Sequence, residues 1–238
     1  MNRLASIALV AVSIASVAAP AVAQSVPGFA GATLRLDFGS RLGSDYSTPN
    51  YSGSFAFSFG GLVAQVDVGR VGYTGGGVSW DNAYALHLGY QLSAATVVGA
   101  FYAQDFCATG FTNCQPYVGI QAVHEFGAVG SLPGAQIEAF VGRYDRRATI
   151  FDVELAVPVM TGLDLVAGVN LWRANGSYNR YSLGAQYAFD NGLLLRGAFN
   201  RVTYSSDELN TVTLGIAYNF GSGAVFSPRR YHVIHRGW

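Results

Sequence analysis

Twelve segments of this sequence alternate apolar and polar residues with a period of two. In one of them, Phe55, Phe57 and Phe59 share one face while Ser54 and Ser58 share the other. Such alternation is typical of strands that have one apolar and one polar face. Most of the segments have the length that a tilted strand needs to cross a bilayer, about 9–11 residues. We therefore predict an all-β fold with twelve strands, at residues 30–38, 51–59, 62–70, 82–90, 96–104, 117–126, 135–143, 149–157, 163–172, 180–189, 193–201 and 211–220.

The composition narrows the class of protein. Half of the residues are hydrophobic, 12% are charged, 30 are glycine and none is lysine. The most apolar stretch after the N-terminus, residues 151–172, is interrupted by Asp152, Glu154 and Pro158, so it does not read as a transmembrane helix. The formal net charge is zero, so nothing indicates nucleic acid as a partner. An apolar, weakly charged strand protein is typical of a membrane β-barrel, which presents an apolar face to lipid and a polar face inward.

The N-terminal residues have the pattern of a secretory signal peptide. A basic residue, Arg3, precedes an Ala/Val/Ile/Leu run that ends in Ala21-Val22-Ala23 before Gln24. Pro20 and the many Ala and Ser residues argue against the alternative of a membrane-anchor helix. We expect residues 1–23 to be removed on export.

The connections between the segments alternate in length. Short or glycine-marked connections such as residues 60–61 and 190–192 alternate with longer ones such as 39–50, 71–81 and 105–116. Short periplasmic turns and long extracellular loops are typical of outer-membrane barrels. A soluble β-sandwich has no reason to sort its loops in this way. An even number of strands also brings both ends of the barrel to the periplasmic side.

Aromatic residues gather at the ends of the segments. On the predicted lipid-facing phase they close five descending segments, and others lie near the outer rim. Two such bands predict girdles at the depth of the lipid headgroups. They are Phe59, Tyr90, Phe126, Phe189 and Phe220 on the periplasmic side, and Phe38, Tyr73, Trp80, Phe106, Tyr144, Trp172 and Tyr204 on the outer side.

Together, the signal peptide, the twelve segments and "TVTLGIAYNF" at 211–220 resemble a Gram-negative outer-membrane β-barrel of the porin-like kind. The resemblance implies one up-and-down antiparallel barrel over residues 24–220, located in the cell outer membrane. It also implies insertion by the barrel-assembly machinery, which reads such a final strand. The usual porins have sixteen strands, so their trimeric state and constriction loop are not carried over.

Charged residues on the inward phase suggest a pore lining. They place two arginines on one side of the circle of strands and several carboxylates on the other, so that a transverse field would act on solutes. The alternative is that these charges pair inside a plugged barrel. The predicted pore-lining residues are Arg35, Asp37, Asp67, His87, Glu125, Glu138, Asp152, Glu154 and Arg196.

These features predict a passive diffusion channel for small hydrophilic solutes. The competing prediction is a non-conducting structural or adhesive barrel that binds a partner through its outer loops. No G-x-S-x-G motif and no metal-ligand spacing occur, so we expect neither an enzyme nor a cofactor. Cys107 and Cys114, the two cysteines of the chain, fall in one outer loop and are predicted to form a disulfide after export.

Four arginines continue the lipid-facing phase at the outer ends of ascending segments: Arg70, Arg143, Arg173 and Arg201. Guanidinium groups at this depth are suited to the phosphates of lipopolysaccharide. The simpler interpretation is that they snorkel from the strand ends to water.

The last residues, 221–238, are predicted as a periplasmic tail after a flexible "GSG" link. The tail is rich in arginine and histidine. It could fold into the lumen as a plug or gate, bind cell-wall polymer or a periplasmic partner, or form a poorly ordered overhang. A further alternative makes residues 229–238 a strand and one of the twelve segments a wrong assignment.

Overall fold

The structure is a computed structural model that describes residues 28–227, except for 45–46, 74–78, 107–115, 129, 131, 145–147, 175–176 and 205–207. The predicted signal peptide at 1–23 and both cysteines, Cys107 and Cys114, lie outside the described residues. So do residues 228–238 of the predicted tail.

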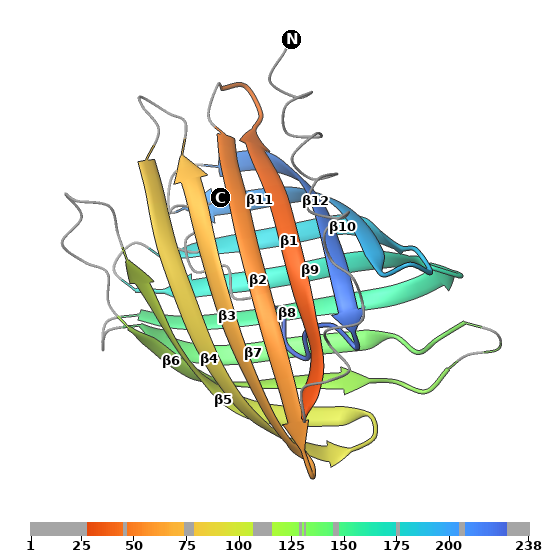
Figure 1. The fold of residues 1–238 in the computed structure, drawn as a ribbon. Coiled ribbons are helices and arrows are strands. Elements are labelled where there is room, and N and C mark those ends of the chain that lie inside the picture. Colours follow the sequence, from red (N-terminus) through yellow and green to blue (C-terminus); the bar gives the residue numbers. More distant parts are fainter. Residues whose placement is uncertain are drawn as a thin grey trace.

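Each of the twelve predicted segments is a strand, and the strands close into one antiparallel barrel (Figure 1). Each strand pairs with its neighbours in sequence, and β1 pairs with β12, so the predicted strand count and fold class are confirmed. The strands are β1 (Phe29–Arg41), β2 (Ser47–Phe59), β3 (Leu62–Tyr73), β4 (Ser79–Ser93), β5 (Thr96–Phe106), β6 (Tyr117–Glu125), β7 (Gln136–Tyr144), β8 (Ala148–Met160), β9 (Leu163–Arg173), β10 (Tyr178–Ala188), β11 (Leu193–Tyr204) and β12 (Glu208–Gly221).

Closure between the first and last strands removes every sheet edge. The register of β1 and β12 is continuous from Gly31 opposite Gly221 to Arg41 opposite Thr211. Each strand therefore has a partner on both sides for its backbone N–H and C=O groups, as hydrocarbon requires. Among the described residues, no helix is long and apolar enough to span a bilayer.

The two rims of the barrel differ less than the sequence predicts. We call the rim where β1 begins and β12 ends the terminal rim, and the opposite one the loop rim. At the loop rim the strands run into the predicted loops, so the connection predicted at 39–50 shrinks to residues 42–46. Polar residues of that segment still pair in the ladder, as Ser40 does with Ser47. At the terminal rim Gly60 and Gly61 adopt positive φ in a tight turn, but residues 126–135 form a long connection there.

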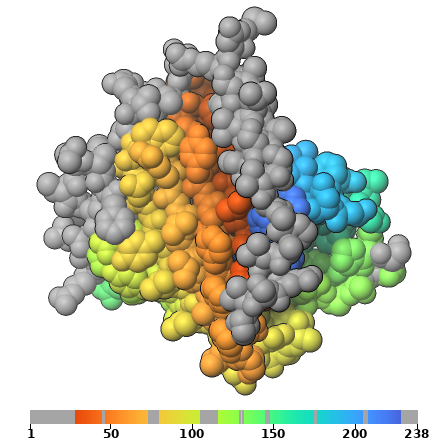
Figure 2. All heavy atoms as spheres, viewed as in Figure 1, coloured from red at the N-terminus to blue at the C-terminus, as the bar shows by residue number. Residues whose placement is uncertain are grey.

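The outer surface of the barrel is apolar and the inner surface contains most of the buried polar groups. Leu88 and Leu183 point outward with 70% and 66% of their surface exposed. Figure 2 shows part of this outer surface over the first strands, where the side chains of neighbouring strands form a continuous layer. Asp67, His87 and Asn170 are buried inside. This polarity is the reverse of that of a soluble domain and requires a lipid environment.

The outer aromatic girdle is only partly where the sequence predicts it. Tyr144, Trp172 and Tyr204 point into the barrel rather than outward, because they fall on the same phase as buried neighbours. Trp172 is 8% exposed and stacks on Tyr178 with 5.9 Å between ring centroids. On the terminal rim Phe59, Tyr90, Phe126 and Phe189 are exposed, whereas Phe220 is half-buried.

Candidate functional site: the barrel lumen

One side of the lumen is filled by aromatic rings. They project from β5 to β10 and pack edge to face, with 4.8 Å between the ring centroids of Phe101 and Tyr117 and 5.7 Å between those of Phe101 and Phe140. The buried cluster comprises Ala85, Phe101, Ala103, Tyr117, Phe140, Ala148, Ile150, Trp172, Tyr178 and Val202. The inward phase of these strands contains the cluster, but the period-two pattern alone does not predict that the rings pack together.

The other side of the lumen is polar. A cavity of about 30 Å³ lies between β1–β3 and β10–β12, and a volume of this size holds about one water molecule. The Oγ1 atom of Thr211, which lines the cavity, is buried and makes no hydrogen bond within the described residues. The cavity lining is Asp37, Gly39, Ser40, Thr48, Asn50, Val71, Arg180, Asn200, Thr211 and Thr213.

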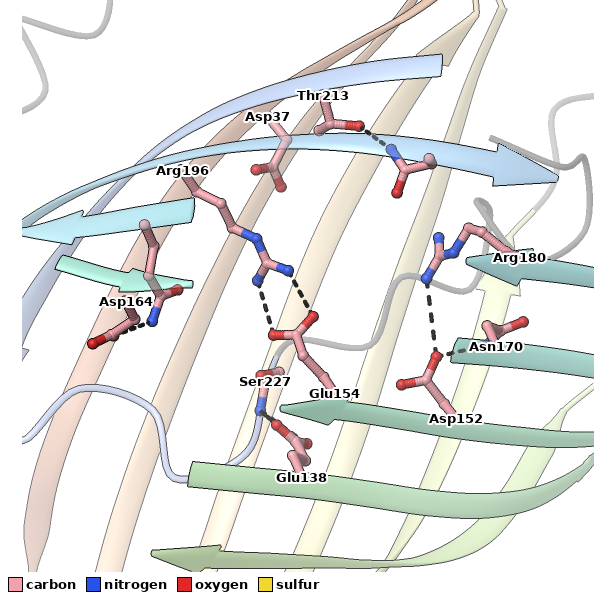
Figure 3. Close-up of polar contacts among 12 residues, drawn as sticks. Asp37, Glu138, Asp152, Glu154, Asp164, Asn170, Arg180, Arg196, Thr213 and Ser227 are labelled. Carbon is pink, nitrogen blue, oxygen red and sulfur yellow. Dashed lines mark hydrogen bonds and ion pairs between the residues drawn. The ribbon is translucent and has the colours of Figure 1, made fainter. Parts of the chain in front are cut away.

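An ion pair crosses the lumen between β8 and β11. The Arg196 guanidinium donates two hydrogen bonds to the Glu154 carboxylate, at 2.9 and 2.6 Å (Figure 3). Because β9 and β10 lie between these strands in the barrel wall, the side chains bridge a chord of the lumen rather than adjacent strands. Bidentate geometry makes this a strong and well-oriented contact.

Other inward charges also have partners. Asp152 accepts a hydrogen bond from Asn170 at 2.7 Å and lies 3.9 Å from Arg180 (Figure 3). Arg35 pairs with Asp37 on the same strand at 2.8 Å. The two opposed groups of charge that the sequence predicts are therefore not separated, because long side chains reach across the lumen and neutralise one another.

A buried polar chain runs across β3, β4 and β6. His87 Nε2 lies 2.9 Å from Asp67 Oδ2, and its Nδ1 lies within hydrogen-bonding distance of Gln121. Gln65 donates to the second oxygen of Asp67 at 2.8 Å. This arrangement holds the imidazole rigidly in the half of the lumen nearer the terminal rim.

The residues after β12 turn back into the barrel. We call Ser222–Ser227 the lumenal segment. The Phe226 side chain has no exposed surface and stacks on His87. Of the alternatives predicted for the tail at 221–238, a position inside the lumen, and not a periplasmic overhang, describes these residues. Gly221 and Gly223 both adopt positive φ, so the "GSG" sequence forms a specific turn instead of a flexible link.

The predicted pore-lining residues thus fall into separate groups. Arg196 and Glu154 meet, Arg35 meets Asp37, Asp67 meets His87, and Glu138 contacts the lumenal segment. Glu125 lies exposed at the terminal end of β6. Their role in conduction remains a prediction.

The four outward arginines lie near the loop rim. Arg70 lies over the Trp80 ring, 4.8 Å from its centroid, and Arg201 is paired with the exposed Glu208. Arg173 donates to Asn179 at 2.7 Å. Arg143 and Arg173 flank Thr149 in register from either side, which places two guanidinium groups on one row of the outer surface. Their contact with lipopolysaccharide remains a prediction.

A closed antiparallel barrel of twelve strands, apolar outside and polar inside, defines a transmembrane barrel of the Gram-negative outer-membrane type. No protein-family model matches the sequence, and no curated protein matches it either.

Solved structures with a similar fold include the KdgM porin in complex with disordered oligogalacturonate. Its TM-score is 0.60 at 9% sequence identity, with 78% of this chain and 98% of that chain covered. The COG4313 outer membrane channel from Pseudomonas putida F1 is similar with a TM-score of 0.54 at 13% identity, with 82% of this chain and 97% of that chain covered. These likenesses establish the shared barrel fold.

Proposed function

We propose that this protein is a channel for the passive diffusion of small hydrophilic solutes across the outer membrane, without chemical conversion of what passes. The observation that carries the proposal is the polar side of the lumen, which faces the aromatic cluster. Its hydroxyl, amide and charged groups line a cavity of about 30 Å³, which is large enough for water. Polar groups around such a space can exchange hydrogen bonds with a hydrated solute. The fold shared with the KdgM porin and the COG4313 channel is consistent with this role.

The charge of the lumen suggests a preference for cations and neutral solutes over anions. On the described inward phase, carboxylates outnumber arginines by eight to four. An acidic passage attracts cations and repels anions. The polyanion oligogalacturonate, present in the KdgM complex, is therefore not the solute that we propose here. The carboxylates are Asp37, Asp67, Asp81, Glu125, Glu138, Asp152, Glu154 and Asp164, and the arginines are Arg35, Arg41, Arg180 and Arg196.

The test is single-channel conductance of the refolded chain in a planar bilayer, with folding checked independently by the heat-modifiable mobility of the barrel on a gel. We expect a steady current and, in a salt gradient, a channel that passes potassium more readily than chloride. The chain ending at Gly221 is measured beside the complete one, since the lumenal segment occupies part of the passage. A folded barrel that stays silent in both forms would overturn the channel proposal.

A second candidate is a non-conducting structural or adhesive barrel that binds a partner through the loop rim. The observation in its favour is the filled interior: the aromatic cluster occupies one side and the lumenal segment crosses the other end. Silence of both forms, together with partner binding that is lost when the connection at 107–116 is shortened, would support this candidate.

A further inference from the structure

We propose that the terminal half of the lumen is a binding site for a short peptide, occupied in this structure by the chain's own lumenal segment, which closes the channel. The peptide-binding part of this inference stands on the contacts of Ser222–Ser227 alone. The closing part rests on the channel function proposed above. Four features of the site carry the inference: a fixed turn, a main-chain clamp, an aromatic pocket and a path across the lumen.

The turn directs the chain inward. Ser222 donates its backbone N–H and its Oγ to the carbonyl of Ala30, at 3.1 and 2.8 Å, and Gly223 donates to Phe220 at 3.2 Å. Positive φ at Gly221 and Gly223 permits the reversal. A β-carbon on Gly31 would lie 2.4 Å from the Gly223 nitrogen, so only glycine at position 31 lets the turn pack on β1.

Side chains of the barrel wall clamp the backbone of the segment. Thr33 Oγ1 accepts from Ala224 N–H at 2.9 Å. The Gln65 amide oxygen accepts from both Val225 and Phe226, and its nitrogen donates to the Phe226 carbonyl, all at 2.8–2.9 Å. The Glu138 carboxylate accepts from Ser227 N–H (Figure 3). Hydrogen bonds to the main chain hold a peptide in place largely independently of its side chains.

A pocket that holds one aromatic ring anchors the lumenal segment. Phe226 stacks on His87 with 5.6 Å between ring centroids and an interplanar angle of 16°. Val63 and Val123 pack with it in one buried cluster. Gly89 leaves the necessary room, because a β-carbon there would lie 3.0 Å from the Phe226 ring. The pocket is thus shaped around a planar side chain, and its imidazole is already fixed by Asp67.

The contacts follow the segment across the barrel. They begin on β1, continue on β3 and β4, and end on β7, which lies on the far side of the circle of strands from β12. A chain that spans this path stands in the way of solutes at the terminal rim. Beyond the turn at Ser222 and Gly223, the hydrogen bonds come from side chains of the barrel wall, so removal of the segment leaves the register of β1 and β12 from Gly31 to Arg41 intact.

Cysteine accessibility tests whether the lumenal segment lies inside the barrel, and the test does not depend on conduction. In a chain with Cys107 and Cys114 replaced by serine, Val225→Cys is exposed to a maleimide carrying a polymer too large to enter the lumen. Ser222→Cys, at the exposed turn, is the matched control. We expect the control to be modified and Val225→Cys to be protected, and we expect Gln65→Leu to remove the protection. Equal modification of both cysteines would overturn the peptide site.

A peptide added in trans tests the closure. The chain ending at Gly221 should conduct more than the complete chain, and an amidated peptide of residues 222–227 should restore the block at about 1 mM, which approximates the effective concentration of a short tether. A peptide with Phe226→Ala should need about tenfold more, because it loses the stacked ring.

Equal current from both chains with Val225→Cys still protected would overturn closure and leave the peptide site standing. A silent but folded shortened chain would instead overturn the channel function. The two failures are therefore distinguishable.

Discussion

At the scale of single residues, the ion pair between Arg196 and Glu154 determines the charge balance of the passage. The Arg196 side chain is 12% exposed and that of Glu154 is 33% exposed. Solvent therefore reaches the pair only in part and screens neither charge well. In the chain ending at Gly221, Glu154→Gln leaves a cation across the lumen and should shift the reversal potential in a potassium chloride gradient toward anions. Arg196→Gln should shift it toward cations. The double variant restores the balance and is the control; shifts of the same sign in both single variants would contradict the assignment.

The buried Phe101 ring connects the aromatic cluster to the His87 ring, with 6.0 Å between the two centroids. Phe101→Ala removes a buried aromatic side chain and leaves a cavity, so we expect a loss of about 3 kcal/mol in the free energy of unfolding. The measurement is urea unfolding of the barrel in lipid vesicles. Leu88→Ala on the lipid face, where the side chain is 70% exposed within the protein, is the matched control and should cost less. An equal loss in both would mean that the interior cluster is not a packed core.

Residues such as Asp67, His87 and Arg196 could be assigned to the interior from the sequence, because the period of two decides which face a side chain occupies. The hydrogen-bonding partners of these residues could not be predicted from the sequence. Arg196 meets Glu154 across two intervening strands, and the reach of the side chains and the tilt of the strands set that contact. Neither quantity has a local sequence signal. Phe101, Tyr117 and Phe140 lie on the same inward phase and could have been found from it, whereas Trp172 lies near one rim, where an aromatic residue resembles part of a girdle.

At the scale of elements, the outer ends of β3, β7, β9 and β11 each carry an arginine on the lipid face. Arg143 and Arg173 lie in register on either side of Thr149, and two neighbouring guanidinium groups are the arrangement best suited to binding one phosphate. Replacing Arg143 and Arg173 by Gln should weaken co-purification of lipopolysaccharide more than the same change at Arg201, with conductance unchanged. Equal lipopolysaccharide content in all variants would favour simple snorkelling of these side chains.

Element boundaries show what alternation does not capture. The predicted strand core at 62–70 is confirmed, yet β3 continues to Tyr73 and β1 to Arg41, because the backbone ladder pairs residues beyond the alternating segments, such as Tyr73 with Ser79 and Arg41 with Thr211. The path of the C-terminal segment could not be predicted for a different reason. Ser222–Ser227 has no alternation of its own, and its position depends on Thr33, Gln65 and Glu138, which come from three distant strands.

At the scale of the whole molecule, closure of β1 on β12 is the condition for stability in lipid. A chain that ends at Gly221 keeps the full register from Gly31 to Arg41, whereas a chain that ends at Asn210 loses β12 from Thr211 onward. The second chain leaves two strand edges with unpaired backbone groups, each costing several kcal/mol in hydrocarbon.

We therefore expect the chain ending at Gly221 to refold in detergent and to migrate as a compact band that shifts on heating. The chain ending at Asn210 should migrate as unfolded at every temperature. Protease resistance of the reconstituted material provides a second readout of the same difference. A heat-modifiable band from the shorter chain would mean that the remaining eleven strands close without β12, and that the β1–β12 seam does not determine whether the barrel forms.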